Sequence, residues 1–471
     1  MKKINPVLQY FLKIISMLRT NIRDYGMYIA LVVIFGVFSI ITGGLFLGPV
    51  NFTNLLNQTA YVAVLAVGMT LVIVTRQIDL SVGFLGAFLG AYIVVEVENA
   101  GASVGLALIT ALIITIVIGF IKGFLVAKVR VPSFVVTLAG MFIFKGMLLL
   151  KTNSTTIPAT HEFFRIIGVN YLSSYQVGPF NLLALILGFL VIITLAVMSI
   201  LRYRHDKKVG IKGNDLSMVI SKLVFLTIII GFITYTLAAY RGVSYLIFIT
   251  IIVVIVYHFL TTKTVLGRRI YAVGGNPDAA ELSGISVQRI IIFVFISMGV
   301  LTMIAGLMYV SMLRTANPNY GISWELYAIA ATYIGGTSAN GGVGKVINSF
   351  VGAIVIMSIQ NGMKLAGFPS NIEPVVLGAV LLLAVIFDIY TRNVRSIDLV
   401  GVHYAKVKYN EEFALARNNY LEAKKALKVV DKEDNLKVLE LEFELMKAQG
   451  QYNQIKDRIR SSKEEEFVNG V

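Results

Sequence analysis

The side chains that most often carry chemistry are scarce in this chain. It has 471 residues and no cysteine, so neither a disulfide nor a thiolate metal site is available. Its four histidines, none within helical reach of another, are His161, His205, His258 and His403. The sequence contains no HExxH or GxSxG motif and no pair of carboxylates on a plausible soluble face. We therefore expect no catalytic residue, no metal site and no cofactor in this chain.

A glycine-rich stretch, GGTSANGGVGK (335–345), resembles a phosphate-binding loop at first sight. A P-loop requires GxxxxGK[ST], but Ala339 occupies the first glycine position and Val346 replaces the hydroxyl residue. The stretch therefore cannot bind ATP as a P-loop does. If ATP drives this protein, a partner ATPase subunit must bind the ATP and its Mg²⁺.

Polar residues interrupt an apolar region in TRQIDLSVGFLGAFLGAYIV (75–94). We expect Asp79 or Ser81 to cap the next helix, because a side-chain oxygen there can accept hydrogen bonds from the free N–H groups of the first turn. Glycine and alanine then recur at a spacing that permits close helix packing. We interpret the segment as a tightly packed turnaround at the inner membrane face, in preference to a gate. Its motif residues are Ile78, Asp79, Leu80, Ser81, Val82 and Gly83.

A second polar stretch, LGRRIYAVGGNPDAAELSGISVQR (266–289), contains signals for a short helix. Asn276 is a favourable N-cap, Pro277 takes the first helical position, and Asp278 lies in the first turn. Gly284 supplies a left-handed stop. A helix of about two turns is unstable alone in water, so it must pack on something. It is either an ordinary capped surface turn or, as we favour, a docking knob for a groove of a soluble partner.

Neutral polar residues inside apolar regions are candidates for lining a solute pathway. They are Thr337, Ser338 and Asn340 in the glycine-rich break, and Gln360 and Asn361 near the end of an apolar segment. Irregular backbone at membrane depth is tolerated only where protein or a cavity shields it, which favours the break as pathway-facing. Hydrogen bonding between helices is an equally good explanation of these residues.

These polar residues are set in a very apolar chain. Hydrophobic residues make up 57% of it and charged residues 14%, and its mean hydropathy is +0.79. Since about 20 apolar residues cross a bilayer, we predict an all-α polytopic membrane protein with about ten to twelve transmembrane helices. The expected segments are 27–48, 59–75, 82–98, 103–126, 132–150, 180–201, 220–240, 243–261, 289–312, 326–338, 344–362 and 371–390.

The net charge of +15 is scattered between the apolar segments. We attribute it to membrane orientation and to anionic lipid, not to nucleic acid. Loops rich in Lys and Arg, including one with Lys122, Lys128 and Arg130, predict that both termini are cytosolic. Residues 1–26 suit a cytosolic amphipathic helix on the inner leaflet, with a buried partner helix as the alternative.

The composition changes sharply after Arg395. We predict a transmembrane domain at 27–393, a linker at 394–404 and a cytosolic region at 405–471. Apolar residues of the last region recur at steps of three and four in two runs. An antiparallel helical hairpin is the simplest structure, and a dimeric coiled coil is the alternative.

Five segments together resemble a known family. They are QIDLSVG, KVRVPSFVVTLAGMFIFKG, GRRIYAVGGNPDAAELSGI, YAIAATYIGGTSANGGVG and FPSNIEPVVLGAVLLLAVIFD. In this order they are similar to the permease subunits of bacterial ABC importers for monosaccharides, in the xylose and multiple-sugar branch of the ribose-type permeases. Gln77 departs from the family pattern, which usually has Gly or Glu there, and the region after Arg395 has no counterpart in it.

The resemblance implies a permease homodimer in the bacterial cytoplasmic membrane, with a sugar pathway between its two copies. An extracytoplasmic sugar-binding protein would deliver the sugar, and separate ABC ATPase subunits would supply the energy. The residues that match the family's ATPase-coupling helix are Asn276, Pro277, Asp278, Ala279, Ala280, Glu281, Leu282, Ser283 and Gly284.

Three other hypotheses stay open. The chain could be an importer permease for another small solute, such as a branched-chain amino acid or a signalling furanose. An ion-coupled secondary transporter needs intramembrane acids, yet Asp79, Glu325, Glu373 and Asp388 lie near the ends of predicted segments. A lipid-linked glycosyl enzyme would need a loop with convergent acidic or metal-binding residues.

Overall fold

The protein is described from a computed structural model. The described residues are 22–208, 216–383, 385–386, 415–416, 418–426 and 440–454. The chain divides into two compact units, Met1–Val385 and Ile386–Val471. Residues 1–21 of the amphipathic helix predicted at 1–26 lie outside the described residues, and so does the whole linker predicted at 394–404.

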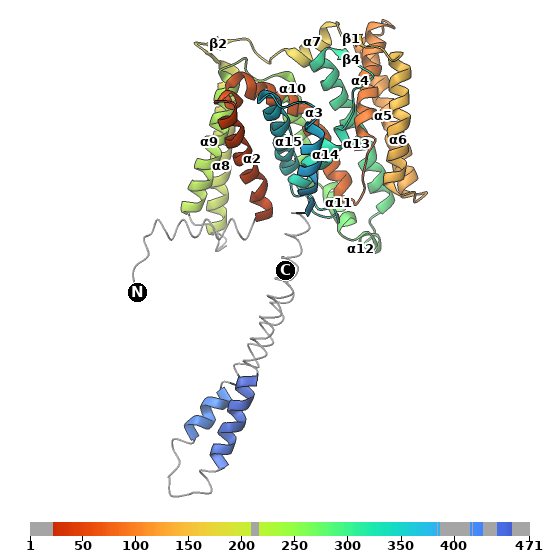
Figure 1. Cartoon of the computed structure of the whole chain (residues 1–471). Coiled ribbons are helices and arrows are strands. Elements are labelled where there is room, and N and C mark those ends of the chain that lie inside the picture. Colours follow the sequence, from red (N-terminus) through yellow and green to blue (C-terminus); the bar gives the residue numbers. More distant parts are fainter. Residues whose placement is uncertain are drawn as a thin grey trace. The chain divides into compact units, whose positions relative to one another are not determined.

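The first unit consists mainly of helices (Figure 1). In chain order the elements are α2 (Ile22–Ile41), the 3-10 turn η1 (Leu45–Leu47), α3 (Pro49–Val74), α4 (Val82–Glu98), α5 (Val104–Ala127), α6 (Ser133–Thr152), β1 (Ile157–Pro158), α7 (Glu162–Val169), β2 (Gln176–Val177), β3 (Phe180–Asn181), α8 (Leu182–Lys208), α9 (Leu216–Ala238), α10 (Tyr245–Lys263), α11 (Val265–Gly275), α12 (Pro277–Leu282), α13 (Val287–Leu313), β4 (Thr315–Ala316), α14 (Trp324–Ile334) and α15 (Val346–Leu365). An apolar helix, Glu373–Leu383, follows α15.

The predicted all-α polytopic membrane class is confirmed. Within the described part of the chain, seven helices are long and apolar enough to cross a membrane; they are α3, α5, α6, α8, α10, α13 and α15. Shorter apolar helices cover Met27–Ile41, Leu223–Ala238 and Glu373–Leu383, and α4 has 17 residues. The predicted total of ten to twelve spans stays a prediction, because seven helices among the described residues meet both the length and the hydropathy requirement.

The start of α3 differs most from the sequence prediction. The helix begins at Pro49 and not near residue 59, because Gly48 is extended and Pro49 fits the first helical position. Several asparagines before residue 59 resemble a loop in the sequence, which explains the wrong boundary. Every side chain from Thr59 to Val74 is buried. α3 therefore runs through the interior of the first unit.

Glycines permit the close packing of α4 against α13. A Cβ atom added to Gly86 would lie 3.2 Å from the carbonyl oxygen of Thr302, and one added to Gly90 would lie 2.7 Å from that of Gly306. The backbones thus approach without intervening side chains. The tightly packed helix expected after residue 81 is present. In contrast, α5, α6 and α8 carry exposed large apolar side chains, as helices in contact with hydrocarbon do.

Shorter elements mark two opposite ends of the first unit (Figure 1). At one end, which we call the α7 end, α7 lies with β1 and β4, which pair antiparallel. At the other, the α12 end, lie α11 and α12. The sequence prediction missed α11, whose start is fixed by Thr264: its hydroxyl accepts a hydrogen bond from the Gly267 N–H at 3.1 Å.

The described residues of the second unit are helical at 418–426 and 440–454. The ring of Tyr420 stacks on that of Tyr452, with centroids 5.7 Å apart and an interplanar angle of 15°. The two predicted helical runs therefore meet within one chain, as they do in a hairpin.

Candidate coupling region and solute cavity

The short helix α12 is capped at both of its ends. The Asn276 side chain accepts a hydrogen bond from the Ala279 N–H at 3.1 Å, Pro277 begins the helix, and Gly284 has a φ of 78°. The predicted start, stop and length are confirmed. Ala280 is only 4% exposed and packs into the main core, whereas Leu282 is 91% exposed.

The exposed side of α12 combines charge with one apolar tip. Asp278 and Glu281 are exposed beside Leu282. Single exposed apolar side chains are common on protein surfaces, so the docking knob and the ordinary capped turn both stay hypotheses.

Arg76 connects the end of α3 to the end of α11. Its backbone is left-handed, with a φ of 62°. Its guanidinium donates to the carbonyl oxygen of Gly274 at 2.7 Å and also to that of Gly275. These carbonyls directly precede the cap of α12. Charge-assisted hydrogen bonds therefore connect the end of α3 to the backbone just before α12.

The glycine-rich loop after α14 completes this junction. The Gly342 N–H donates to the carbonyl oxygen of Val74 at 2.9 Å, and the Tyr271 hydroxyl donates to that of Gly344 at 2.7 Å. Burial raises the pKa of Tyr271, which lies in α11. Three stretches that are far apart in the sequence thus meet here.

The polar residues of the glycine-rich break lie at this junction. Thr337 and Ser338 are buried, and Asn340 is exposed. None of these three residues lines the large cavity described below. Their predicted role in the pathway stays a prediction, and their observed surroundings are those of a packed loop.

Asp79 and Lys122 form a buried ion pair. The Lys122 ammonium donates to Asp79 Oδ2 at 2.6 Å and to the Ser81 hydroxyl at 3.0 Å, while Asp79 Oδ1 accepts from the N–H and the hydroxyl of Ser81. Asp79 is 0% exposed and Lys122 4%. The predicted cap is wrong, because neither Asp79 nor Ser81 accepts from the first turn of α4. Lys122 is also not a loop cation as expected, since it lies within α5.

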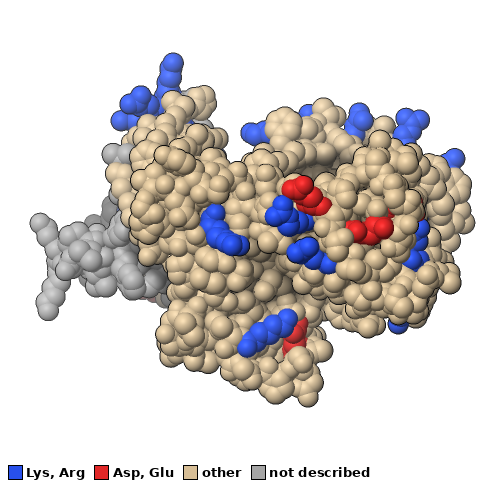
Figure 2. Space-filling model, turned by 90° about the horizontal axis from the view of Figure 1, so that it is seen from above, with Lys and Arg blue, Asp and Glu red and all other residues tan. Residues whose placement is uncertain are grey.

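A cavity of about 450 Å³ opens at the α7 end. Its lining is mostly neutral and polar or aromatic. The lining residues are Asn54, Asn57, Gln58, Tyr61, Gly168, Val169, Tyr171, Tyr240, Arg241, Tyr309, Met312, Leu313, Met357, Gln360 and Lys364. Figure 2 views this end from above: most of the surface is uncharged, and several Lys, Arg, Asp and Glu side chains lie near the middle of the view. Burial raises the pKa of Tyr171, one of the phenols that line the cavity.

One face of α3 supplies much of the cavity wall, although none of its residues is among the predicted pathway residues. Asn54, Asn57, Gln58 and Tyr61 have the spacing i, i+3, i+4 and i+7, which places them on the same side of a helix. This helical periodicity, together with Pro49 as the first residue of a helix, is the sequence signal that could have identified these cavity residues.

Aromatic rings lie where α3 and α13 meet at the cavity. Tyr61 and Tyr309 line it, and their ring centroids lie 4.8 Å apart. The ring of Trp324 lies 4.9 Å from Tyr61 and 4.5 Å from Tyr309, and Trp324 is 3% exposed. The cavity thus combines amide groups with aromatic faces.

The two predicted pathway residues of α15 have different surroundings. Gln360 lines the cavity. Asn361 is 7% exposed and exchanges side-chain hydrogen bonds with Asn51 of α3 at 2.9 and 3.2 Å. Of the five predicted pathway residues, the structure brings only Gln360 to the cavity, and Asn361 joins two helices.

Residues 51–385 match the family described as "Branched-chain amino acid transport system / permease component". The matched range contains both the cavity and the junction. No solved structure matches the chain.

Three characterised relatives show how far the similarity extends. The chain is 37% identical to the xylose transport system permease protein of Haemophilus influenzae, over 78% of this chain and 96% of the relative. It is 33% identical to the ribose import permease protein of Bacillus subtilis, over 78% and 92%. It is 36% identical to the L-arabinose ABC transporter permease protein of Azospirillum brasilense, over 51% and 69%. The chain therefore belongs to the family of membrane permeases represented by the branched-chain amino acid transport system permease component.

Proposed function

We propose that this chain is the transmembrane permease subunit of an ATP-binding-cassette importer and translocates a monosaccharide, xylose or several sugars. The names of the xylose, ribose and arabinose relatives support this substrate class. The observation that carries the proposal is the cavity, whose amides and phenols suit an uncharged polyhydroxy solute. The aromatic faces of Tyr61 and Tyr309 suit the C–H faces of a sugar ring.

The proposed mechanism couples the two ends through α3. A separate ATPase subunit, which holds the ATP and Mg²⁺, grips the coupling helix Asn276–Gly284 at the cytosolic α12 end. A shift of α12 passes through the Arg76 hydrogen bonds to α3. Tyr61 lies thirteen residues from Val74 in the same helix, about 20 Å along its axis. A rigid, buried α3 can therefore change the cavity when α12 moves.

The remaining proposed partners are those that the family resemblance implies. An extracytoplasmic sugar-binding protein delivers the sugar to the α7 end, a second permease copy makes a homodimer, and membrane lipid covers the exposed apolar helices. The location is the bacterial cytoplasmic membrane with both termini in the cytosol, and the chain itself carries no cofactor and no catalytic residue.

A branched-chain amino acid is the second candidate substrate, since the matching family description names that class. An α-amino acid carries an ammonium group, which a transport site usually pairs with a carboxylate. The described cavity-lining residues include Arg241 and Lys364 but no Asp or Glu. This favours the sugar.

Uptake by a strain that lacks this gene tests the proposal directly. We expect the deletion to abolish high-affinity uptake of at least one sugar in a panel of labelled pentoses and hexoses, and the cloned gene to restore it. Unchanged uptake of every sugar, with loss of leucine or valine uptake, would select the second candidate. Uphill transport by the purified chain on an ion gradient, without nucleotide or other proteins, would overturn both.

Leu282→Arg is expected to reduce sugar uptake and substrate-stimulated ATPase activity by about 30-fold or more, the size of an interface hot spot. The reason is that Leu282 makes the apolar tip of the knob and is 91% exposed, so the variant still folds. Gln288→Arg, at another exposed position of the same end, is the matched control and should transport normally. Normal sugar uptake and normal substrate-stimulated ATPase activity in the Leu282→Arg variant would contradict the docking role.

A further inference from the structure

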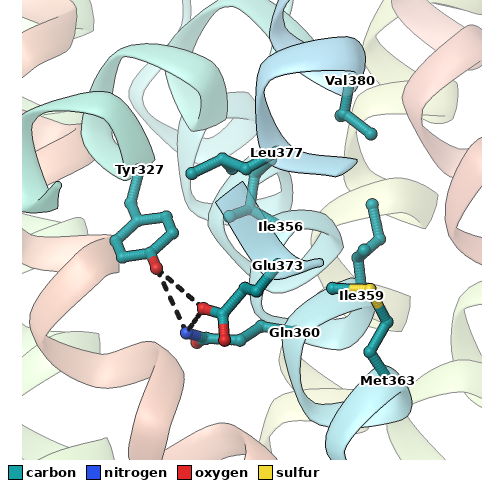
Figure 3. Close-up of a pocket in the computed structure, with 8 residues that line it drawn as sticks. All are labelled: Tyr327, Ile356, Ile359, Gln360, Met363, Glu373, Leu377 and Val380. Atoms are coloured by element: carbon teal, nitrogen blue, oxygen red, sulfur yellow. Dashed lines mark hydrogen bonds between the residues drawn. The ribbon is translucent and has the colours of Figure 1, made fainter. Parts of the chain in front are cut away.

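A carboxylate next to the cavity is engaged on both of its oxygens. Glu373 Oε1, at the start of the helix Glu373–Leu383, accepts from the Tyr327 hydroxyl at 2.8 Å and from the Gln360 amide (Figure 3). The Gln360 amide nitrogen also lies 3.2 Å from the Tyr327 hydroxyl. The second oxygen of Glu373 faces the Lys364 ammonium at 3.7 Å.

This network fixes which way the Gln360 side chain points. A carboxylate can only accept hydrogen bonds, so the NH₂ group of Gln360, and not its carbonyl oxygen, must face Glu373. With the NH₂ group engaged by Glu373 and Tyr327, the carbonyl oxygen at the other branch of the planar amide is left to accept a hydrogen bond. Gln360 lines the 450 Å³ cavity as well as the small apolar pocket around Leu377.

We propose that Glu373 is a positioning residue for substrate recognition: it holds Gln360 so that the amide presents a hydrogen-bond acceptor to a hydroxyl group of the solute. This inference rests on the proposed function, since it requires a hydroxylated substrate in the cavity. Glu373 itself does not line the large cavity. Its effect on the substrate is exerted through Gln360.

The same contacts give Lys364 a defined partner. Lys364 lines the cavity, and Glu373 is its ion-pair partner. One carboxylate thus neutralises a cavity cation and orients a cavity amide. A neutral acceptor next to a paired cation suits a sugar hydroxyl, which can donate one hydrogen bond and accept another.

A purely structural role is the competing explanation. In that case Glu373 only attaches the helix Glu373–Leu383 to α14 and α15, and its loss lowers stability without altering which hydroxyl pattern is preferred. The two explanations differ in substrate discrimination. A site built to bind a hydroxyl rejects the analogue that lacks it, because the site's polar group is left unpaired.

The experiment measures KM and maximal rate in vesicles that contain the complete importer, with the preferred sugar and each of its monodeoxy analogues. We expect the wild type to discriminate against one analogue by about tenfold or more. Glu373→Gln is expected to raise KM for the parent sugar about tenfold at a similar maximal rate. It should also abolish most of that discrimination, because a glutamine at 373 can face Gln360 with either end of its amide.

Two further variants complete the test. Tyr327→Phe leaves the contact between the carboxylate and Gln360 in place, so it should keep the discrimination. Gln360→Met removes the hydrogen-bond acceptor and should abolish the discrimination between the sugar and its deoxy analogue. This variant keeps the proposal testable if Glu373→Gln fails to fold. Unchanged KM and discrimination in Glu373→Gln, or retained discrimination in Gln360→Met, would overturn the inference. A wild type that transports no sugar would instead overturn the proposed function.

Discussion

Lys122→Met should destabilise the folded protein by about 3–5 kcal/mol, the usual cost of leaving one partner of a buried ion pair unpaired. Asp79 would lose its ammonium partner at 2.6 Å in a place where it is 0% exposed. The hydrogen bonds from Ser81 satisfy only one of its two carboxylate oxygens. Unfolding of the purified protein in detergent, followed by circular dichroism against denaturant, measures the change.

Two variants control this experiment. Lys128→Met removes a lysine from the exposed C-cap position of the same helix, so its effect should be small. The double variant Asp79→Asn with Lys122→Met removes both charges and should recover most of the stability, because a neutral pair replaces an uncompensated buried charge. Equal denaturation midpoints for Lys122→Met and Lys128→Met would contradict a stabilising role of the buried ion pair.

Gly274→Ala is expected to disrupt the junction that transmits movement from α12. A Cβ atom there would lie 1.8 Å from the carbonyl oxygen of Val74 and 2.7 Å from the Gly342 nitrogen, so backbone must shift. We expect a loss of about 1–3 kcal/mol of stability or more. Substrate-stimulated ATPase activity and uptake should fall together at least tenfold, because α11 is displaced from Arg76.

The neighbouring glycine offers a matched control. A Cβ atom added to Gly275 has nothing within 4 Å, so Gly275→Ala should keep normal uptake and stability. Equal behaviour of the two variants would show that α11 does not need close contact with α3. If Gly274→Ala lost stability but stayed coupled, the junction would be structural only.

The helices were largely predictable because their signals are local. Apolar runs of about 20 residues and the cap signals of Asn276, Pro277 and Gly284 depend on nearby residues alone, and the structure agrees with them. The prediction failed where local signals compete. The asparagines before residue 59 resemble a loop, yet Pro49 begins the helix and their common face lines a cavity.

The sequence by itself determined the membrane class, the order of the helices, the capped knob and the family resemblance, since composition, periodicity and short motifs encode each of these. Only the tertiary structure decided that Lys122 pairs with Asp79, that Arg76 meets Gly274, and that Glu373 orients Gln360. The first two contacts join residues 43 and 198 positions apart. The third depends on how a separate short helix packs on α15. Such pairings depend on how whole helices pack, and no local pattern in the chain specifies them.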